Sequence, residues 1–166
     1  MNENFDYIIV GGGTAGCVLA ARLSEDADKR ILLLEAGPAK RGLFLRVPIG
    51  YFKTIFDPAL GWGYQTNPQK NLNNRQISWP RGKVLGGTGA INGLVYIRGR
   101  RDDYDAWHKL GNNGWSYADV LPYFRKSECQ SAGNRPLDPS FHGFSGPLSV
   151  TDNPACHPLC DAFITA

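Results

Sequence analysis

The stretch Asp6–Gly37, DYIIVGGGTAGCVLAARLSEDADKRILLLEAG, decides the fold of this chain. It begins with an apolar run, Tyr7–Val10, which is typical of a parallel strand covered on both faces. A glycine-rich turn follows, then residues with helical apolar spacing, then a second apolar run, Ile31–Leu34. The sequence therefore predicts a strand, a tight turn, a helix and a second strand, which together make a βαβ unit.

Three glycines in the turn, Gly11, Gly13 and Gly16, have the spacing G-x-G-x-x-G. The first permits a tight turn, the second lets the backbone approach a pyrophosphate, and the third lets the helix lie close to the strand. The N-terminus of the helix adds unpaired N–H groups and the positive end of the helix dipole. This arrangement predicts a dinucleotide site in a Rossmann-like unit.

Glu35 stands at the carboxyl end of the second predicted strand. Its distance from Gly16 matches that of the acidic residue that accepts hydrogen bonds from ribose hydroxyls in such units. A glycine-rich turn in an ordinary βαβ unit is the alternative, but it does not account for this acid. We expect the helix to pack through one apolar stripe, made of Ala15, Val18, Leu19 and Leu23.

The composition is that of a soluble globular domain. Of 166 residues, 42% are hydrophobic and 20% are charged, and the net charge of +3 is too small to indicate a nucleic-acid partner. No apolar run approaches the roughly 20 residues of a membrane helix, and no basic region precedes the first apolar run as in a signal peptide. We expect a cytoplasmic protein, with peripheral membrane association as an alternative.

Four scattered cysteines fit free thiols in a reducing compartment. Cys17 lies on the predicted helix, where we expect a small buried thiol. Cys156, His157 and Cys160 form the one metal-like cluster, but a single C-x3-C without a second pair does not predict a zinc site. We therefore expect no metal.

The segment 38–80 contains five prolines and many aromatic residues. The prolines and glycines of this segment exclude long helices and strands, and its aromatic content argues against disorder. The segment is therefore predicted to be an ordered cover over another part of the protein. Asn73-Asn74 predicts a hairpin turn within it.

A second glycine-rich stretch, WPRGKVLGGTGAINGLVYIRGRRDDYD, spans residues 79–105. Crowded glycines expose backbone N–H groups to a planar or anionic ligand. The apolar spacing of Ile91, Leu94 and Val95 predicts a short helix that begins near Thr88. A purely structural turn is the alternative, but two such turns in one small chain favour a single extended dinucleotide.

Farther along the chain, Asp102–Leu110 predicts a helix that ends at Gly111, and Ser116 with Asp119 resembles a capping box for the next helix. The stretch 130–146 is rich in glycine, serine and proline and predicts a loop. The residues 148–150 predict a strand, and 159–166 predict the start of a helix.

The sequence resembles the N-terminal part of glucose–methanol–choline (GMC) oxidoreductases, in the choline- and alcohol-dehydrogenase branch. DYIIVGGGTAGCVLAARLSED, LLLEAG, GNNGWSYADVLPYFRKSE and FHGFSGPLSVTD support the resemblance. Residues 82–105 fit the first signature of the family without a gap. Gly89 stands where many members have serine. The resemblance covers essentially the whole chain.

This resemblance implies FAD-dependent oxidation of an alcohol (a CH–OH donor) by hydride transfer to the flavin, with oxygen or a quinone-like acceptor. It implies the adenosine ribose at Glu35, the pyrophosphate at Gly13–Gly16, and a flavin lid over 38–80. Some members tether FAD through a histidine before the signature asparagine; here Ile91 precedes Asn92, which implies non-covalent FAD. The implied cofactor residues are Gly11, Gly13, Thr14, Ala15, Gly16, Glu35, Ala36, Gly82, Val84, Gly87, Thr88, Asn92, Gly93, Leu94 and Val95.

The predicted fold is α/β: a Rossmann-like FAD-binding domain over residues 1–135, then the start of an incomplete α+β substrate domain over 136–166. GMC proteins are longer, so we expect an N-terminal fragment, inactive by itself. None of His108, His142 and His157 matches the catalytic histidine of the family. The alternatives are a truncated, non-catalytic FAD-binding module and an NAD-dependent Rossmann dehydrogenase, which the stretch 82–93 disfavours.

Overall fold

The computed structural model describes residues 4–39, 42–131, 136–153 and 157–166. The chain divides into two compact units, Met1–Val95 and Tyr96–Ala166, and each is described by itself. No helix in these described ranges is long and apolar enough to cross a membrane.

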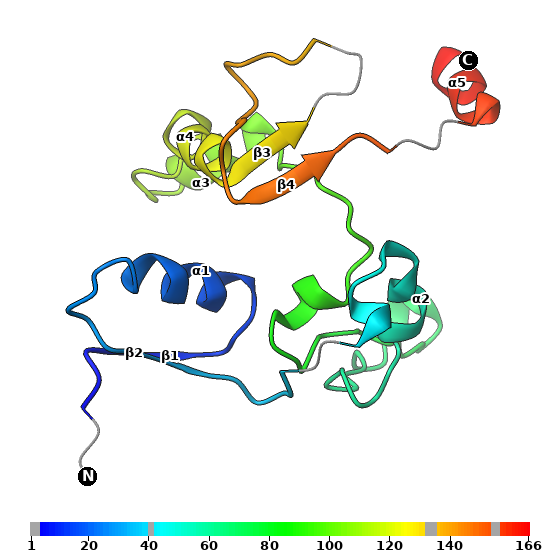
Figure 1. The fold of residues 1–166 in the computed structure, drawn as a ribbon. Coiled ribbons are helices and arrows are strands. Elements are labelled where there is room, and N and C mark those ends of the chain that lie inside the picture. The colour runs from blue at the N-terminus through cyan, green and yellow to red at the C-terminus, as the bar shows by residue number, and fades with distance from the viewer. Residues whose placement is uncertain (1–3, 40–41, 132–135, 154–156) are drawn as a thin grey trace. The chain divides into compact units, whose positions relative to one another are not determined.

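The first unit begins with the predicted βαβ arrangement (Figure 1). Strands β1 (Tyr7–Val10) and β2 (Ile31–Leu34) are parallel, with Tyr7 opposite Ile31 and Val10 opposite Leu34. Helix α1 (Thr14–Leu23) connects them. Both strands have the predicted bounds, because each is a short apolar run between polar or glycine residues.

The packing of this βαβ unit differs from the prediction. Gly16 is buried, and a Cβ atom at this position would lie 1.9 Å from the carbonyl oxygen of Gly11. The helix therefore lies close to β1 at Gly16, whereas Val18 and Leu19 of the predicted stripe are more than half exposed. Val10 is 83% exposed, so the residues of this unit do not by themselves cover both faces of the strands.

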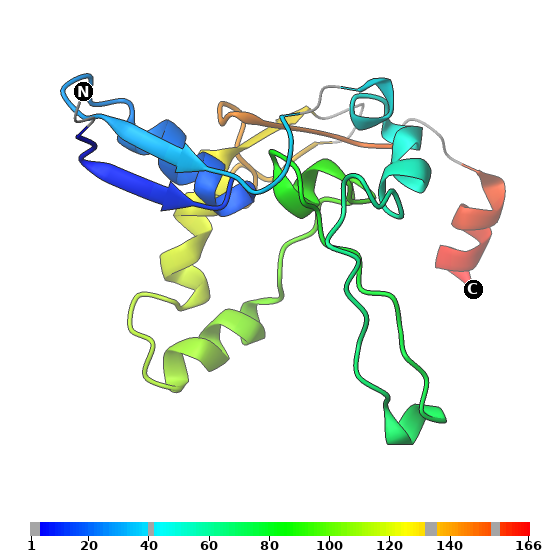
Figure 2. The same cartoon turned by 90° about the horizontal axis from the view of Figure 1, so that it is seen from below.

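The segment after β2 consists of short elements. Two 3₁₀ turns, Leu43–Leu45 and Pro48–Gly50, lead into the single-turn helix α2 (Tyr51–Thr54). An antiparallel hairpin follows over 61–82, and Figure 2 shows its two arms running side by side. Its tip contains a 3₁₀ turn, Lys70–Leu72, and then Asn73 and Asn74 with φ angles of 55° and 56°. These left-handed residues confirm the predicted hairpin turn.

The buried core of the first unit lies beside the second glycine-rich stretch. Leu60, Val84 and Ile91 form it, each at most 4% exposed. The helix predicted from Thr88 is absent here: one 3₁₀ turn, Gly87–Ala90, is followed by residues without regular secondary structure. Glycine weakens helices, and the chain turns to positive φ at Leu94, so the apolar spacing was overridden.

The second unit contains three helices and a parallel pair of strands in its described residues: α3 (Arg101–Lys109), α4 (Tyr117–Ser127), β3 (Glu128–Ser131), β4 (Leu148–Thr151) and α5 (Pro158–Thr165). The capping box of α4 is confirmed, since the Asp119 amide donates to Ser116 Oγ and the Ser116 amide donates to the Asp119 carboxylate. The first residues of the predicted loop 130–146 instead belong to β3, and 132–135 lie outside the described residues.

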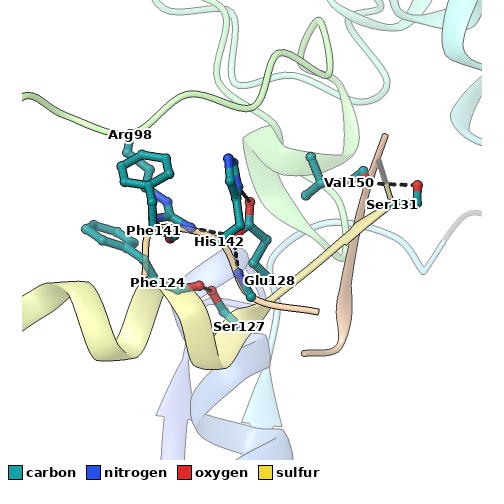
Figure 3. A network of polar contacts seen from close by, with 9 residues as sticks. Arg98, Phe124, Ser127, Glu128, Ser131, Phe141, His142 and Val150 are labelled. Atoms are coloured by element: carbon teal, nitrogen blue, oxygen red, sulfur yellow. Dashed lines mark hydrogen bonds and ion pairs between the residues drawn. The ribbon is translucent and has the colours of Figure 1, made fainter. Parts of the chain in front are cut away.

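A buried carboxylate organises the second unit (Figure 3). Glu128 has no exposed surface; its Oε2 pairs with Arg98 and accepts a 2.8 Å hydrogen bond from the amide of Gly143. Its Oε1 lies 3.1 Å from His142 Nδ1. The guanidinium of Arg98 also lies over the rings of Phe124 and Phe141 and donates to the Phe141 carbonyl. The side chain of Glu128 thus links the end of α4 to the loop before β4.

Candidate functional site

The two glycine-rich turns meet in the first unit. The amide of Gly86 donates a 2.7 Å hydrogen bond to the carbonyl of Gly12. A Cβ atom at Gly87 would lie 2.9 Å from the Cα atom of Gly13, so the two backbones are in direct contact. The second turn is closed by Thr88, whose hydroxyl accepts from the Gly82 amide at 3.1 Å. The structure therefore supports the inference that both turns serve one site.

The carboxylate of Glu35 is fixed at the end of β2. Its Oε2 accepts a 2.7 Å hydrogen bond from the amide of Gly12, and its Oε1 accepts one of 2.8 Å from the amide of Gly37. A carboxylate has about four acceptor positions, so it has capacity for two more donors. Glu35 thus joins the first turn to the second strand and still offers lone pairs to a ligand.

A cavity of about 750 Å³ opens beside these groups. Its volume lies within the range of about 300–1,000 Å³ that is usual for cofactor and ligand sites. The predicted site residues that line it are Gly11, Gly13, Glu35, Ala36, Gly82, Gly87 and Thr88. Sequence reasoning did not assign the other five: Val10, Leu34, Trp62, Tyr64 and Arg81.

The glycine backbone at this cavity leaves room for a bulky anion. A Cβ atom at Gly11 would meet nothing within 4 Å, and one at Gly13 would reach only the Gly87 Cα at 4.0 Å. Gly11 has φ +99°, as expected for the tight turn. Gly13 is the N-cap of α1, so the free N–H groups of the first helical turn begin here. A phosphate-bearing group fits this backbone.

Other predicted residues lie elsewhere in the unit. Thr14, Ala15 and Gly16 form the first turn of α1, and Val84 is fully buried in the core, away from the cavity wall. The last four, Asn92, Gly93, Leu94 and Val95, form a segment without regular secondary structure after the second turn. Their predicted contacts with a cofactor stay predictions.

The segment 92–95 contains one residue in an unusual backbone conformation. Leu94 has φ +61°, which bulky side chains rarely adopt, and its amide donates a 2.9 Å hydrogen bond to Asn92 Oδ1. Asn92 and Leu94 also line a smaller cavity of about 80 Å³, together with residues of α2 and the two preceding 3₁₀ turns. Such held conformations are often found at ligand sites.

The histidines and cysteines belong to no group that could hold a metal ion among the residues that the structure describes. His108 is exposed on α3, His142 contacts Glu128, and His157 Nδ1 accepts from the Leu159 amide at 3.2 Å. Cys17 is only partly buried, and its thiol donates to the Gly12 carbonyl. Cys156, part of the metal-like cluster, lies outside the described residues.

Comparison with known proteins identifies the family. Residues 5–166 match the family described as GMC oxidoreductase. The chain belongs to this family. It is 45% identical, over 97% of its length, to an oxygen-dependent choline dehydrogenase of Sinorhizobium fredii. It is 45% identical, over 98% of its length, to an alcohol dehydrogenase [acceptor] of Pseudomonas putida.

Solved structures of the same kind share the fold. An FAD-dependent oxidoreductase from Chaetomium thermophilum matches 98% of this GMC chain and 29% of its own length, at 38% identity and a TM-score of 0.83. This confirms the predicted α/β class. The chain likewise spans 29% of the length of the two curated relatives.

Proposed function

We propose that the protein carrying this chain oxidises an alcohol with FAD as the hydride acceptor, and that this chain supplies most of the FAD site. The observation that carries the proposal is the cavity in which two glycine-rich turns meet the carboxylate of Glu35. The choline and alcohol dehydrogenases among the relatives favour a hydroxyl substrate, and the solved relative is FAD-dependent.

The chain's own residues would hold the cofactor in an extended form. Glu35 would accept the ribose hydroxyls, and Gly13–Gly16 with the first turn of α1 would bind the pyrophosphate. The segment Asn92–Val95 would run along the flavin, and 38–80 would act as its lid. Bound flavin supplies the hydride acceptor. We also propose that the FAD-binding domain ends near residue 135 and that the substrate domain begins there.

The proposal is tested on the purified protein as its gene encodes it. Flavin absorbance in the visible range, together with reduction of a dye on addition of an alcohol, is the expected result. Colourless protein that binds NAD instead would favour the NAD-dependent alternative. Yellow protein that reduces no dye with any alcohol would favour the non-catalytic FAD-binding module.

Glu35→Ala is expected to weaken FAD binding by about 1.5–3 kcal/mol, the range for a hydrogen bond to a charged group. The reason is the position of the carboxylate at the cavity wall, with acceptor capacity left over. Titration calorimetry of the apoprotein with FAD gives the affinity. Unfolding of the apoprotein in urea measures separately the loss of the bonds to Gly12 and Gly37, and an unchanged FAD affinity contradicts the assigned role.

FAD is expected to be dissociable from this protein. The position before Asn92 is Ile91, which offers no nucleophile and is 1% exposed within the hydrophobic core. Acid precipitation of the holoprotein should therefore leave the yellow flavin in the supernatant. Flavin that stays with the washed pellet would show a covalent link elsewhere in the protein.

A further inference from the structure

One face of the hairpin 61–82 combines aromatic rings with positive charge. Trp62 donates its amide to the Arg81 carbonyl at 3.0 Å, and Trp79 donates to the Tyr64 carbonyl at 2.8 Å. The bridges Gly61–Gly82 and Gln65–Ser78 fix the same antiparallel register. In such a register, directly opposite residues and alternate residues along a strand share a face. Trp62, Tyr64, Trp79 and Arg81 therefore share one face of the hairpin.

The contacts on this face hold the rings in place. The rings of Trp62 and Tyr64 are stacked, with centroids 5.9 Å apart and planes 7° apart. The ammonium of Lys83 lies 4.8 Å from the Trp62 ring, and the guanidinium of Arg81 lies 5.0 Å from the Trp79 ring. Trp62 and Tyr64 are nevertheless 44% and 51% exposed, so these rings are not core residues.

The exposed part of this face belongs to the cavity already described. Trp62, Tyr64 and Arg81 line it together with Gly13 of the first turn and Glu35 at the end of β2. Exposed aromatic rings bind the flat faces of nucleic-acid bases, and a guanidinium binds phosphate oxygens. The cavity thus combines a stacking surface, a cation, a glycine turn at a helix N-terminus and an acceptor for ribose hydroxyls.

We propose that Trp62, Tyr64 and Arg81 form the wall of the cavity that recognises adenosine diphosphate, the half of FAD that carries no flavin. Trp62 and Tyr64 contact the adenine ring, and Arg81 pairs with the diphosphate. This assignment rests on the proposed function, and it gives the segment 38–80 a direct part in holding the cofactor. The chemistry it recognises is shared by FAD, NAD and free ADP.

The test measures the binding of FAD, ADP and adenosine to the complete apoprotein by titration calorimetry. Trp62→Ala is expected to weaken FAD and ADP by the same factor, about 5- to 150-fold, as for loss of one base-stacking ring. Trp62→Phe keeps an aromatic face and should stay within about threefold of the unmodified protein. Arg81→Ala is expected to weaken ADP about 10- to 150-fold and to leave adenosine unchanged.

Two control variants separate recognition from other effects. Arg75→Ala removes the same charge from the tip of the same hairpin, away from the cavity, and should leave the affinity for ADP unchanged. Trp62→Leu keeps an apolar side chain without a π face, so it replaces Trp62→Ala if the smaller residue prevents folding. The contrast between Trp62→Leu and Trp62→Phe then carries the test.

The outcomes distinguish this inference from the proposed function. A loss of FAD binding without a matching loss of ADP binding, or equal affinities in all variants, overturns the inference even if the protein is yellow. An unmodified protein that binds ADP and NAD but not FAD, and loses both through Trp62→Ala, supports the inference while the proposed function fails. Binding of neither FAD nor ADP to the unmodified protein overturns both.

Discussion

Arg98→Ala is expected to lower the free energy of unfolding by about 3–5 kcal/mol, the usual effect of removing one partner of a buried ion pair. The side chains of Arg98 and Glu128 are 5% and 0% exposed, so neither charge is solvated by water. Burial by itself would raise the pKa of Glu128, but the Gly143 amide, His142 and Arg98 together hold this pKa below its ordinary value. The carboxylate therefore stays charged at neutral pH, and without Arg98 it loses its cationic partner.

Urea unfolding of the protein at neutral pH measures this effect, and an exposed ion pair provides the control. Arg100 and Asp102 are 83% and 79% exposed, so Arg100→Ala should change stability by no more than about 1 kcal/mol. The double variant Arg98→Met with Glu128→Leu removes both charges and should recover part of the loss, because the buried amide of Gly143 is left without its acceptor. A single Arg98→Ala variant as stable as Arg100→Ala would show that the pair does not hold the unit together.

The elements that sequence reasoning predicted correctly carry strong local signals. The two correctly predicted strands are apolar runs between polar or glycine residues, Tyr7–Val10 and Ile31–Leu34. The helix ends are marked by the capping box at Ser116 and by Gly111, which act through the local backbone and need no tertiary contact. The G-x-G-x-x-G spacing and the acid that follows it predicted three of the residues that line the cavity, Gly11, Gly13 and Glu35. The other four, Ala36, Gly82, Gly87 and Thr88, came from the second glycine-rich stretch and from the family resemblance.

The failures arose where tertiary contacts decide the outcome. Periodicity located α1 but did not predict that Gly16 is its point of closest approach to the first turn, which the backbone contact with the Gly11 carbonyl determines. The sequence ECQS of β3 has no apolar alternation, so only its pairing with β4 makes it a strand. Trp62 and Arg81 are separated by 18 intervening residues, and their place at the cavity depends on the hairpin register, which local sequence does not fix.

The glycine spacing is expected to serve both the close packing of α1 on the strand and the approach of the pyrophosphate. Gly16→Val and Gly13→Ala are expected to separate these two roles. At Gly16, a Cβ atom would lie 1.9 Å from the carbonyl oxygen of Gly11, and a backbone oxygen cannot rotate away. We therefore expect Gly16→Val to lower the free energy of unfolding by about 3 kcal/mol, the upper end of the range for overpacking. Because the N-terminus of α1 must shift as well, FAD binding should weaken together with the fold.

Gly13→Ala is the matched control, because the added methyl group meets no atom closer than 4.0 Å and the φ angle of −76° suits any residue. Its apoprotein should unfold within about 1 kcal/mol of the unmodified protein, since the substitution weakens only the N-cap of α1. In the proposed function the pyrophosphate lies against this surface, and the methyl group would occupy it, so FAD affinity should fall about 10- to 100-fold. In Gly13→Ala, FAD affinity measured by calorimetry should therefore fall while apoprotein stability measured by urea unfolding is nearly unchanged. In Gly16→Val, both quantities should fall. Unchanged FAD affinity in Gly13→Ala would place the pyrophosphate elsewhere in the cavity.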